Sequence, residues 1–206
     1  MKLLSKAVLA FSLSAASLFA GDAAQGKMKY MTCMACHGLN GEGNVAMKAP
    51  KISGQEDWYV KAQLNKFKND IRGAHPKDVE GMQMAPMAKM LASDTDVENV
   101  VAYIKTLKEK APAETVKGDA ALGKSMYATC MACHGVKAEG NAAMKAPKLT
   151  GQNDWYLVSQ LKKFKSGVRG AHSKDVEGQM MAPMAKILAD DAAINNVVAY
   201  INSLSK

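Results

Sequence analysis

Several features are scarce or missing in this 206-residue chain. Aromatic side chains make up 6% of the residues, which is little for domains of about 90 residues that must each close a core. The sequence has no alternating strand pattern and no βαβ pattern, which excludes sheet proteins and thioredoxin-like proteins. After residue 20 no apolar run is long enough to cross a bilayer, so no integral membrane span remains once the N-terminal segment is removed.

The chain has only four cysteines, and all of them lie in two copies of Cys-Met-Ala-Cys-His, at Cys33 to His37 and at Cys130 to His134. With this spacing two thiols on one helical turn can add to the two vinyl groups of a single porphyrin, while the adjacent imidazole lies beneath the iron. A zinc site would want four ligands, and each motif offers three. We therefore expect two covalently attached haem c groups and no disulfide. The attaching thiols would be Cys33, Cys36, Cys130 and Cys133, and the iron-binding imidazoles His37 and His134.

The two motifs stand 97 residues apart, and the same offset relates most of the chain to itself. Met84-Ala-Pro-Met87 matches Met181-Ala-Pro-Met184, for example, and no insertion or deletion is needed from Gly26 to the C-terminus. The chain is therefore a tandem repeat. We expect a signal peptide at 1–20, an N-terminal domain at 21–110, a linker at 111–118 and a C-terminal domain at 119–206.

The first 20 residues have the pattern of a secretory signal peptide. Lys2 and Lys6 precede an apolar run, Ala7 to Leu13, which continues through small residues to Ala20. An uncleaved anchor is the alternative, but the stretch is short and rich in Ser and Ala. Cleavage after Ala20 would remove two lysines and lower the net charge from +8 to +6.

Each half reads as helices joined by loops. In the first half we expect helices at 23–36, 55–68 and 94–108, with glycine-rich or interrupted loops at 38–51 and 69–83. Ser53 and Glu56 could form a capping box for the second helix. The expected fold class is all-α.

Five signals recur in the same order in both halves: the haem motif, Ala-Pro-Lys-Ile/Leu-x-Gly-Gln, a helix with Trp-Tyr, Met-x-x-Met, and a final helix with Val-Ala-Tyr-Ile. In this the chain resembles class I cytochrome c, and specifically the dihaem cytochromes c4. The resemblance implies two tandem class I cytochrome c domains, haems that face each other across an interdomain contact, and electron transfer in the periplasm. It also implies that Gly26 and Tyr30 pack against Tyr103, and that Gly123, Tyr127 and Tyr200 repeat this packing.

The resemblance also implies a hydrogen-bond acceptor for each haem-binding histidine and a distal ligand for each iron. The backbone carbonyls of Pro50 and Pro147 would accept a hydrogen bond from the ring nitrogen that does not bind iron. The distal iron ligands would be Met84 and Met181, with Met87 and Met184 as the rivals. Met ligation favours Fe(II) and raises the potential.

Other methionines and histidines are also possible ligands of the iron or of another metal. Met47 and Met144 lie in the first loop and are assigned to packing. His75 and His172 could instead give bis-histidine ligation, which would lower the potential, but their polar loop favours a surface position. A methionine-rich copper site is a further alternative.

Charged and aromatic residues near the expected haems also repeat. Arg72 and Arg169 could pair with haem propionates. Trp58 and Trp155 could line the haem edge. A basic cluster on equivalent helices could steer redox partners, and it comprises Lys66, Lys68, Lys162, Lys163 and Lys165.

The expected function is electron transfer and not catalysis. The protein would carry single electrons from a quinol-oxidising complex, such as a quinol-cytochrome c reductase, to a terminal oxidase or reductase, and would dock on acidic surfaces of these partners. One alternative is the dihaem cytochrome subunit of a flavin-containing sulfide dehydrogenase. Another is a dihaem peroxidase, for which the chain is short. No nucleic acid partner is expected.

Overall fold

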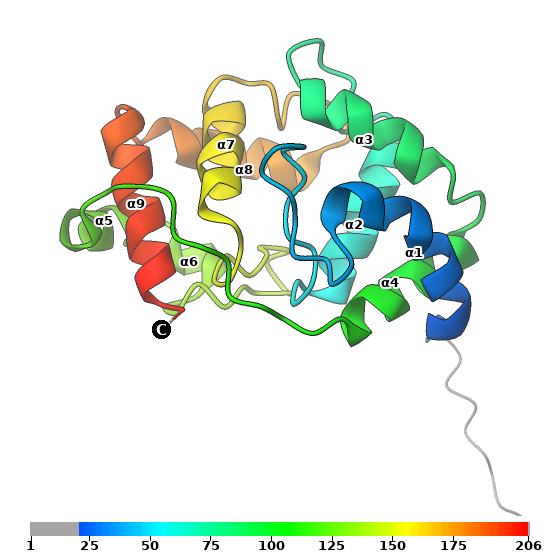
Figure 1. Cartoon of the computed structure of the whole chain (residues 1–206). Coiled ribbons are helices and arrows are strands. Elements are labelled where there is room, and N and C mark those ends of the chain that lie inside the picture. The colour runs from blue at the N-terminus through cyan, green and yellow to red at the C-terminus, as the bar shows by residue number, and fades with distance from the viewer. Residues whose placement is uncertain (1–20, 206) are drawn as a thin grey trace, which may run out of the picture.

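The computed structural model describes residues 21–205, so the predicted signal peptide lies outside the described residues (Figure 1). Over that range the regular elements are helices, joined by loops that contain two isolated β-bridges, Asn44 with Ala49 and Asn141 with Ala146. No helix between residues 21 and 205 is long and apolar enough to cross a membrane. The predicted all-α class is confirmed.

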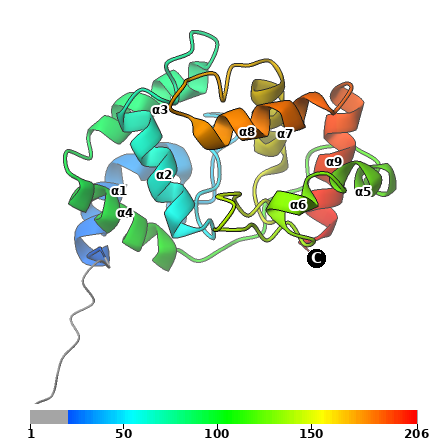
Figure 2. The same ribbon diagram turned by 180° about the vertical axis from the view of Figure 1, so that it is seen from behind.

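The helices form two similar sets. The first set is α1 (Ala23–His37), α2 (Asp57–Lys68), α3 (Val79–Lys89) and α4 (Asp94–Thr106). In the second set, the counterpart of α1 is divided into α5 (Ala120–Tyr127) and α6 (Met131–His134), and these are followed by α7 (Asp154–Lys165), α8 (Val176–Lys186) and α9 (Asp191–Ser203). Seen from behind, each set forms its own bundle (Figure 2).

The first and last helices of each set cross at a glycine. A Cβ on Gly26 would lie 1.8 Å from the backbone oxygen of Asn99, so only glycine lets α1 approach α4 this closely. Next to this crossing the rings of Tyr30 and Tyr103 pack with centroids 5.2 Å apart. The packing that the resemblance implies is therefore confirmed. The second set repeats it with Gly123, Tyr127 and Tyr200, whose ring centroids lie 5.4 Å apart.

One helix differs from the sequence prediction. The predicted loop at 69–83 ends at Asp78, because the carboxylate of Asp78 accepts a hydrogen bond from Gly81 N and caps helix α3. Gly81 and Pro86, which usually interrupt helices, both lie inside it. The predicted capping box is also wrong, since the Ser53 hydroxyl donates to Gly41 O and α2 begins after Glu56 without a side-chain cap.

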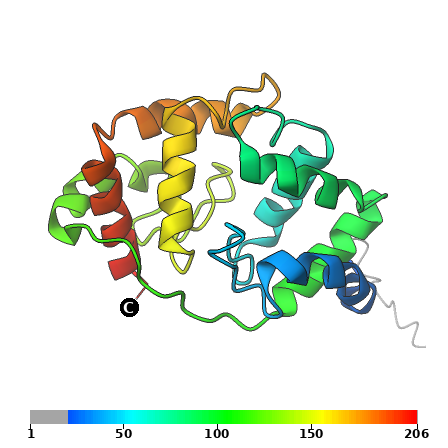
Figure 3. The same cartoon turned by 45° about the horizontal axis from the view of Figure 1, so that its top comes forward.

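The two bundles lie side by side, and the chain that joins them runs along one edge (Figure 3). Residues 108–119 of this connection form no regular element. The contacts between the halves are reciprocal. Lys51 N donates to Asn153 Oδ1 (2.6 Å), and the equivalent Lys148 N donates to Glu56 Oε2 (3.2 Å). The interface thus has the pattern of a two-fold symmetric contact within one chain.

Candidate haem sites

The haem motif of the first half closes helix α1. His37 is the last helical residue, and Gly38 follows it with φ of 83°, a left-handed conformation that suits glycine. Gly135 ends α6 in the same way at φ of 83°. The four thiols are partly buried and form no disulfide. Burial raises the pKa of the Cys33 thiol to about 11, with a further contribution from Cys36.

The two motif histidines have the same environment. His37 Nδ1 lies 2.8 Å from Pro50 O, and His134 Nδ1 lies 2.8 Å from Pro147 O. A carbonyl accepts only from a protonated nitrogen, so this contact places the proton on Nδ1 and leaves the Nε2 lone pair for a metal. Burial also lowers the pKa of both imidazoles, which favours the neutral form that binds iron.

A tyrosine hydroxyl, for which the sequence predicts no role, donates a hydrogen bond to the glycine that follows each motif. Tyr30 Oη donates to Gly38 O (2.7 Å), and Tyr127 Oη donates to Gly135 O (2.8 Å). Both rings are almost fully buried. The repetition of tyrosine at both positions was the available signal, but the sequence did not indicate where the hydroxyl points.

The candidate distal ligands differ in exposure. Met84 on α3 and Met181 on α8 are half-buried, and Met84 packs against the hydrophobic core of its half. Met87 and Met184, one turn later, are 37% and 40% exposed. The loop residues Met47 and Met144 are exposed as well. The first methionine of Met-Ala-Pro-Met is therefore the less exposed of the two in both halves, and in the first half it is also packed against the core.

The lysines of the predicted basic cluster differ in position, because two of them, Lys66 and Lys163, are bound within the interface between the halves. Lys66 Nζ lies 2.5 Å from Asp175 Oδ1 and 2.6 Å from Glu177 Oε2, both in the other half. The reciprocal contacts, also at 2.5 and 2.6 Å, join Lys163 Nζ to Asp78 Oδ1 and Glu80 Oε2. The remaining members contact Ser93 O (Lys68), Asp191 (Lys162), and Leu188 O and Ala189 O (Lys165).

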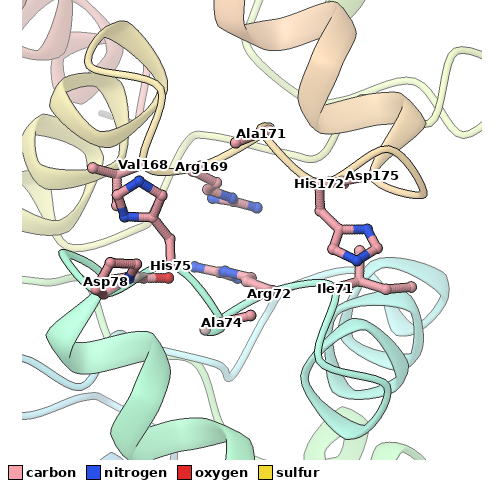
Figure 4. A pocket seen from close by; sticks show the side chains of 13 residues that line it. Ile71, Arg72, Ala74, His75, Asp78, Val168, Arg169, Ala171, His172 and Asp175 are labelled. Carbon is pink, nitrogen blue, oxygen red and sulfur yellow. The ribbon is translucent and has the colours of Figure 1, made fainter.

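His75 and His172 line a cavity of about 280 Å³ between the two halves. In Figure 4 the His75 ring lies beside Val168 of the other half, and the His172 ring lies beside Ile71. Each ring accepts a backbone N–H through Nδ1 at 3.1 Å. These half-buried rings therefore belong to the domain interface rather than to an open surface.

Arg72 and Arg169 also lie in this cavity, and neither is a surface residue. Their Nε atoms are buried and have no hydrogen-bond partner among the described residues. Trp58 and Trp155 are half-buried, and each packs edge-on against the tyrosine that follows it.

Comparison with known proteins agrees with this geometry. The Cytochrome c family matches residues 23–108 and 120–205. Cytochrome c4 of Azotobacter vinelandii is 32% identical over 87% of this chain and 89% of its own length. The crystal structure of reduced recombinant cytochrome c4 from Pseudomonas stutzeri superposes with a TM-score of 0.68 at 30% identity, covering 88% of this chain and 98% of that one. A protein of Stutzerimonas stutzeri described as "Thiosulfate dehydrogenase electron acceptor" is 28% identical over 78% of this chain and 74% of its own length.

The chain belongs to the cytochrome c family, with one cytochrome c unit in each half. Within that family it groups with the dihaem cytochromes c4, which match it over most of their length. It carries two covalent haem c groups, attached through Cys33 and Cys36 and through Cys130 and Cys133, and it is an electron-transfer cytochrome. The free thiols and the available imidazole Nε2 atoms fit such a group.

Proposed function

We propose that the protein is a periplasmic carrier that takes single electrons from a quinol-oxidising complex and passes them to a terminal oxidase or reductase. The observation that carries this proposal is the equivalence of the two halves. Both present a carbonyl-held imidazole and a half-buried methionine, and one reciprocal interface joins them. Two equivalent redox centres in contact suit transfer of electrons better than chemistry on a substrate.

In this proposal each iron has a histidine and a methionine ligand, His37 with Met84 and His134 with Met181. The haem supplies the one-electron chemistry. The protein holds the imidazole tautomer through Pro50 O and keeps water from the thioether by packing it against the core. We further propose the domain boundaries given above, with residues 111–118 as the linker.

The ligands are tested by optical spectra of the oxidised protein combined with a redox titration. Met84→Ala should abolish the weak far-red band of Met-ligated ferric iron for one haem, about half of the signal, and should lower the potential of that haem. Met87→Ala is the matched control on the same helix and should leave the band unchanged. If Met87→Ala abolishes it and Met84→Ala does not, the ligand is Met87.

A second candidate function concerns the electron donor. The similarity to a thiosulfate dehydrogenase electron acceptor favours an enzyme of sulfur oxidation as the donor, in keeping with the alternative of a cytochrome subunit of a flavin-containing sulfide dehydrogenase. Co-purification from cells tests this. A stable complex with a sulfur-oxidising enzyme would support the subunit, and rapid reduction by a quinol-oxidising complex without such a partner would support the mobile carrier.

A further inference from the structure

The carbonyl that holds the haem histidine of the second half belongs to a peptide group whose N–H contacts the first half. Pro147 O accepts from His134 Nδ1 at 2.8 Å. The N–H of the same peptide, on Lys148, donates to Glu56 Oε2 at 3.2 Å. Glu56 belongs to the first half, where it directly precedes α2. One peptide group therefore lies between an iron-binding imidazole and a carboxylate of the other half.

The first half has the same chain of bonds with a different last member. Pro50 O accepts from His37 Nδ1 at 2.8 Å. The N–H of that peptide, on Lys51, donates to Asn153 Oδ1 of the second half at 2.6 Å. Asn153 stands 97 residues after Glu56, so the two occupy equivalent positions of the repeat. The last acceptor of the chain is therefore a neutral amide in one site and a carboxylate in the other.

A glycine gives each acceptor the space to reach the peptide N–H. A Cβ on Gly140 would lie 2.5 Å from Lys148 N and 3.0 Å from Glu56 Oε2, so a side chain there would push the carboxylate away. Gly43 leaves the same space in the first half, where a Cβ would lie 2.7 Å from Asn153 Oδ1. The approach of the acceptor is thus common to both halves, and its charge is what differs.

The charge of Glu56 acts on the peptide because no lysine or arginine among residues 21–205 forms an ion pair with it. The ammonium of Lys148 lies elsewhere, 3.4 Å from Gly54 O and 3.7 Å from Glu109 Oε2. A hydrogen bond to a charged acceptor is roughly twice as strong as one to a neutral acceptor. The longer distance, 3.2 Å against 2.6 Å, weakens the Coulomb attraction by only about a fifth. The carboxylate therefore polarises its peptide more than the amide does.

A peptide group transmits this polarisation to its carbonyl, because resonance joins its nitrogen and its oxygen. A carboxylate at the N–H increases the negative charge on Pro147 O, which then accepts more strongly from His134. A stronger bond at Nδ1 makes the imidazole a more basic ligand. A more basic ligand stabilises ferric iron, and this lowers the reduction potential.

We propose that Glu56 is a positioning residue for the iron ligand of the opposite half: through the Pro147–Lys148 peptide it raises the basicity of His134 and lowers the potential of the second haem. The proposal rests on the electron-carrier function given above. It assigns part of the difference between the two haem potentials to one pair of equivalent positions, Glu56 and Asn153. The two sites thereby differ although their motif residues are the same.

The test is a spectroelectrochemical titration of the full-length holoprotein, with NMR spectra that assign each step through the Nδ1 protons of His37 and His134. Glu56→Gln keeps an acceptor oxygen on a side chain of the same length and removes the charge. It should raise the potential of the second haem, move the first far less, and shift the His134 Nδ1 proton of the reduced protein to higher field. If the second potential does not rise, or if both rise equally, the proposal is wrong.

A second variant tests the same chain of bonds from the other side. Asn153→Asp places a carboxylate at the peptide N–H of Lys51 and leaves Glu56 in place. It should lower the potential of the first haem and shift the His37 Nδ1 proton to lower field. Far-ultraviolet circular dichroism checks that both variants are folded. An unchanged first potential in a folded Asn153→Asp protein would overturn the proposal.

Glu109→Gln is the matched control for charge alone. Glu109 Oε2 lies 3.7 Å from the ammonium groups of both Lys51 and Lys148. Its loss should therefore change both potentials equally and leave both Nδ1 proton resonances unchanged. A selective rise of the second potential, as large as that in Glu56→Gln, would reject transmission through the Pro147 carbonyl. The NMR comparison needs no redox partner, so failure of the carrier function would appear separately, as absence of reduction by a quinol-oxidising complex.

Discussion

Asp57 and Asp154 occupy equivalent positions at the start of α2 and α7, yet they have different partners. Asp57 is exposed and pairs with Lys105 at 3.0 Å. Asp154 is 1% exposed and accepts hydrogen bonds from Thr115 N (2.5 Å), Thr115 Oγ1 (2.7 Å) and Val116 N (2.8 Å) of the linker. The single linker can cover only one of two equivalent carboxylates. The two aspartates therefore differ because the linker contacts only the second half, and not because of the residues next to them in the sequence.

The neighbouring sequence follows this difference. The position equivalent to Lys105 in the second half is Asn202, whose amide lies 3.4 Å from the Asp154 carboxylate. Burial would raise the pKa of Asp154, but the donors from Val116 and Thr115 outweigh it and hold the pKa below its ordinary value. A neutral amide in place of lysine suits a carboxylate that backbone donors already satisfy.

The largest predicted effect is the loss of stability when Asp154 is replaced. Asp154→Ala leaves the linker N–H groups without their acceptor and should lower the free energy of unfolding by about 3 kcal/mol. Asp57→Ala removes an exposed ion pair and the bond from Trp58 N, whose counterpart from Trp155 N is also lost in Asp154→Ala, and should cost less than about 1 kcal/mol. Chemical denaturation of the holoproteins, followed by circular dichroism, measures both. Equal losses in the two variants would mean that the linker contacts contribute nothing.

The next prediction concerns the ion pairs of the interface, which are the same in both directions between the halves. Lys66→Ala and Lys163→Ala each leave one buried carboxylate, Asp175 or Asp78, without its ion pair at the interface and should each destabilise the protein by about 2 kcal/mol. The second carboxylate of each set keeps a longer contact, Glu177 with Lys145 and Glu80 with Lys48. Because the contacts are reciprocal, the two losses should agree within error. Lys61→Ala, which breaks an outer ion pair with Glu98, is the control and should cost much less. A large difference between Lys66→Ala and Lys163→Ala would contradict the symmetry.

The same ion pairs predict a pH dependence. Lys163 and Lys66 lower the pKa values of Glu80 and Glu177 from the usual 4.5 to about 2. The folded-state pKa is depressed, so this contribution to stability is complete above about pH 4.5 and is lost as the pH falls towards 2. Denaturation from pH 7 to pH 2, compared with Glu80→Gln, measures it. The difference in stability between the wild type and Glu80→Gln should stay constant to about pH 5 and then shrink; a difference that grows in acid would refute the ion pairs.

The smallest predicted effect lies on the outer surface. Lys89 pairs with Asp70 at 2.8 Å, whereas the equivalent residues of the second half are Lys186 and Gly167, and Lys186 has no partner among the described residues. Lys186→Gln should slow oxidation of the reduced protein by the anion ferricyanide about twofold at low salt, and Lys89→Gln should slow it less. Gly167→Asp should mimic Lys186→Gln, since Asp70 already adopts the positive φ of this turn. Stopped-flow rates that are equal for all three variants would exclude steering by this lysine.

The local parts of the fold could be read from the sequence. The haem motifs and the helix at 94–108 each depend on residues close together in the chain, so their spacing was sufficient, and the repeat was visible as a constant offset of 97 residues. Helix α3 was missed because Gly81 and Pro86 lower helix propensity, and its stability comes from the Asp78 cap and the packing of Ala85 and Ala88. Propensity alone does not include such packing.

The interface could not be predicted in this way. The sequence predicts Lys66 and Lys163 as part of a docking surface because a basic helix face usually points to solvent. Their partners Asp175 and Asp78 are more than 80 residues away, and nothing local relates them. The lysine and both acidic residues recur at equivalent positions in the repeat. This recurrence did not indicate which residues pair, or that the pairs join one half to the other.

Because one short connection joins the two halves, their interface can remain closed with a low affinity between them. A short connection keeps one partner at an effective concentration in the millimolar range beside the other. Under that condition an association too weak to survive as a complex of separate chains remains closed most of the time. This explains how ion pairs and shared polar bonds can suffice where a permanent dimer of separate chains usually buries a large apolar surface. Because the bonds between the halves are polar, a partner that offers competing charges could loosen the two haem domains without unfolding either one.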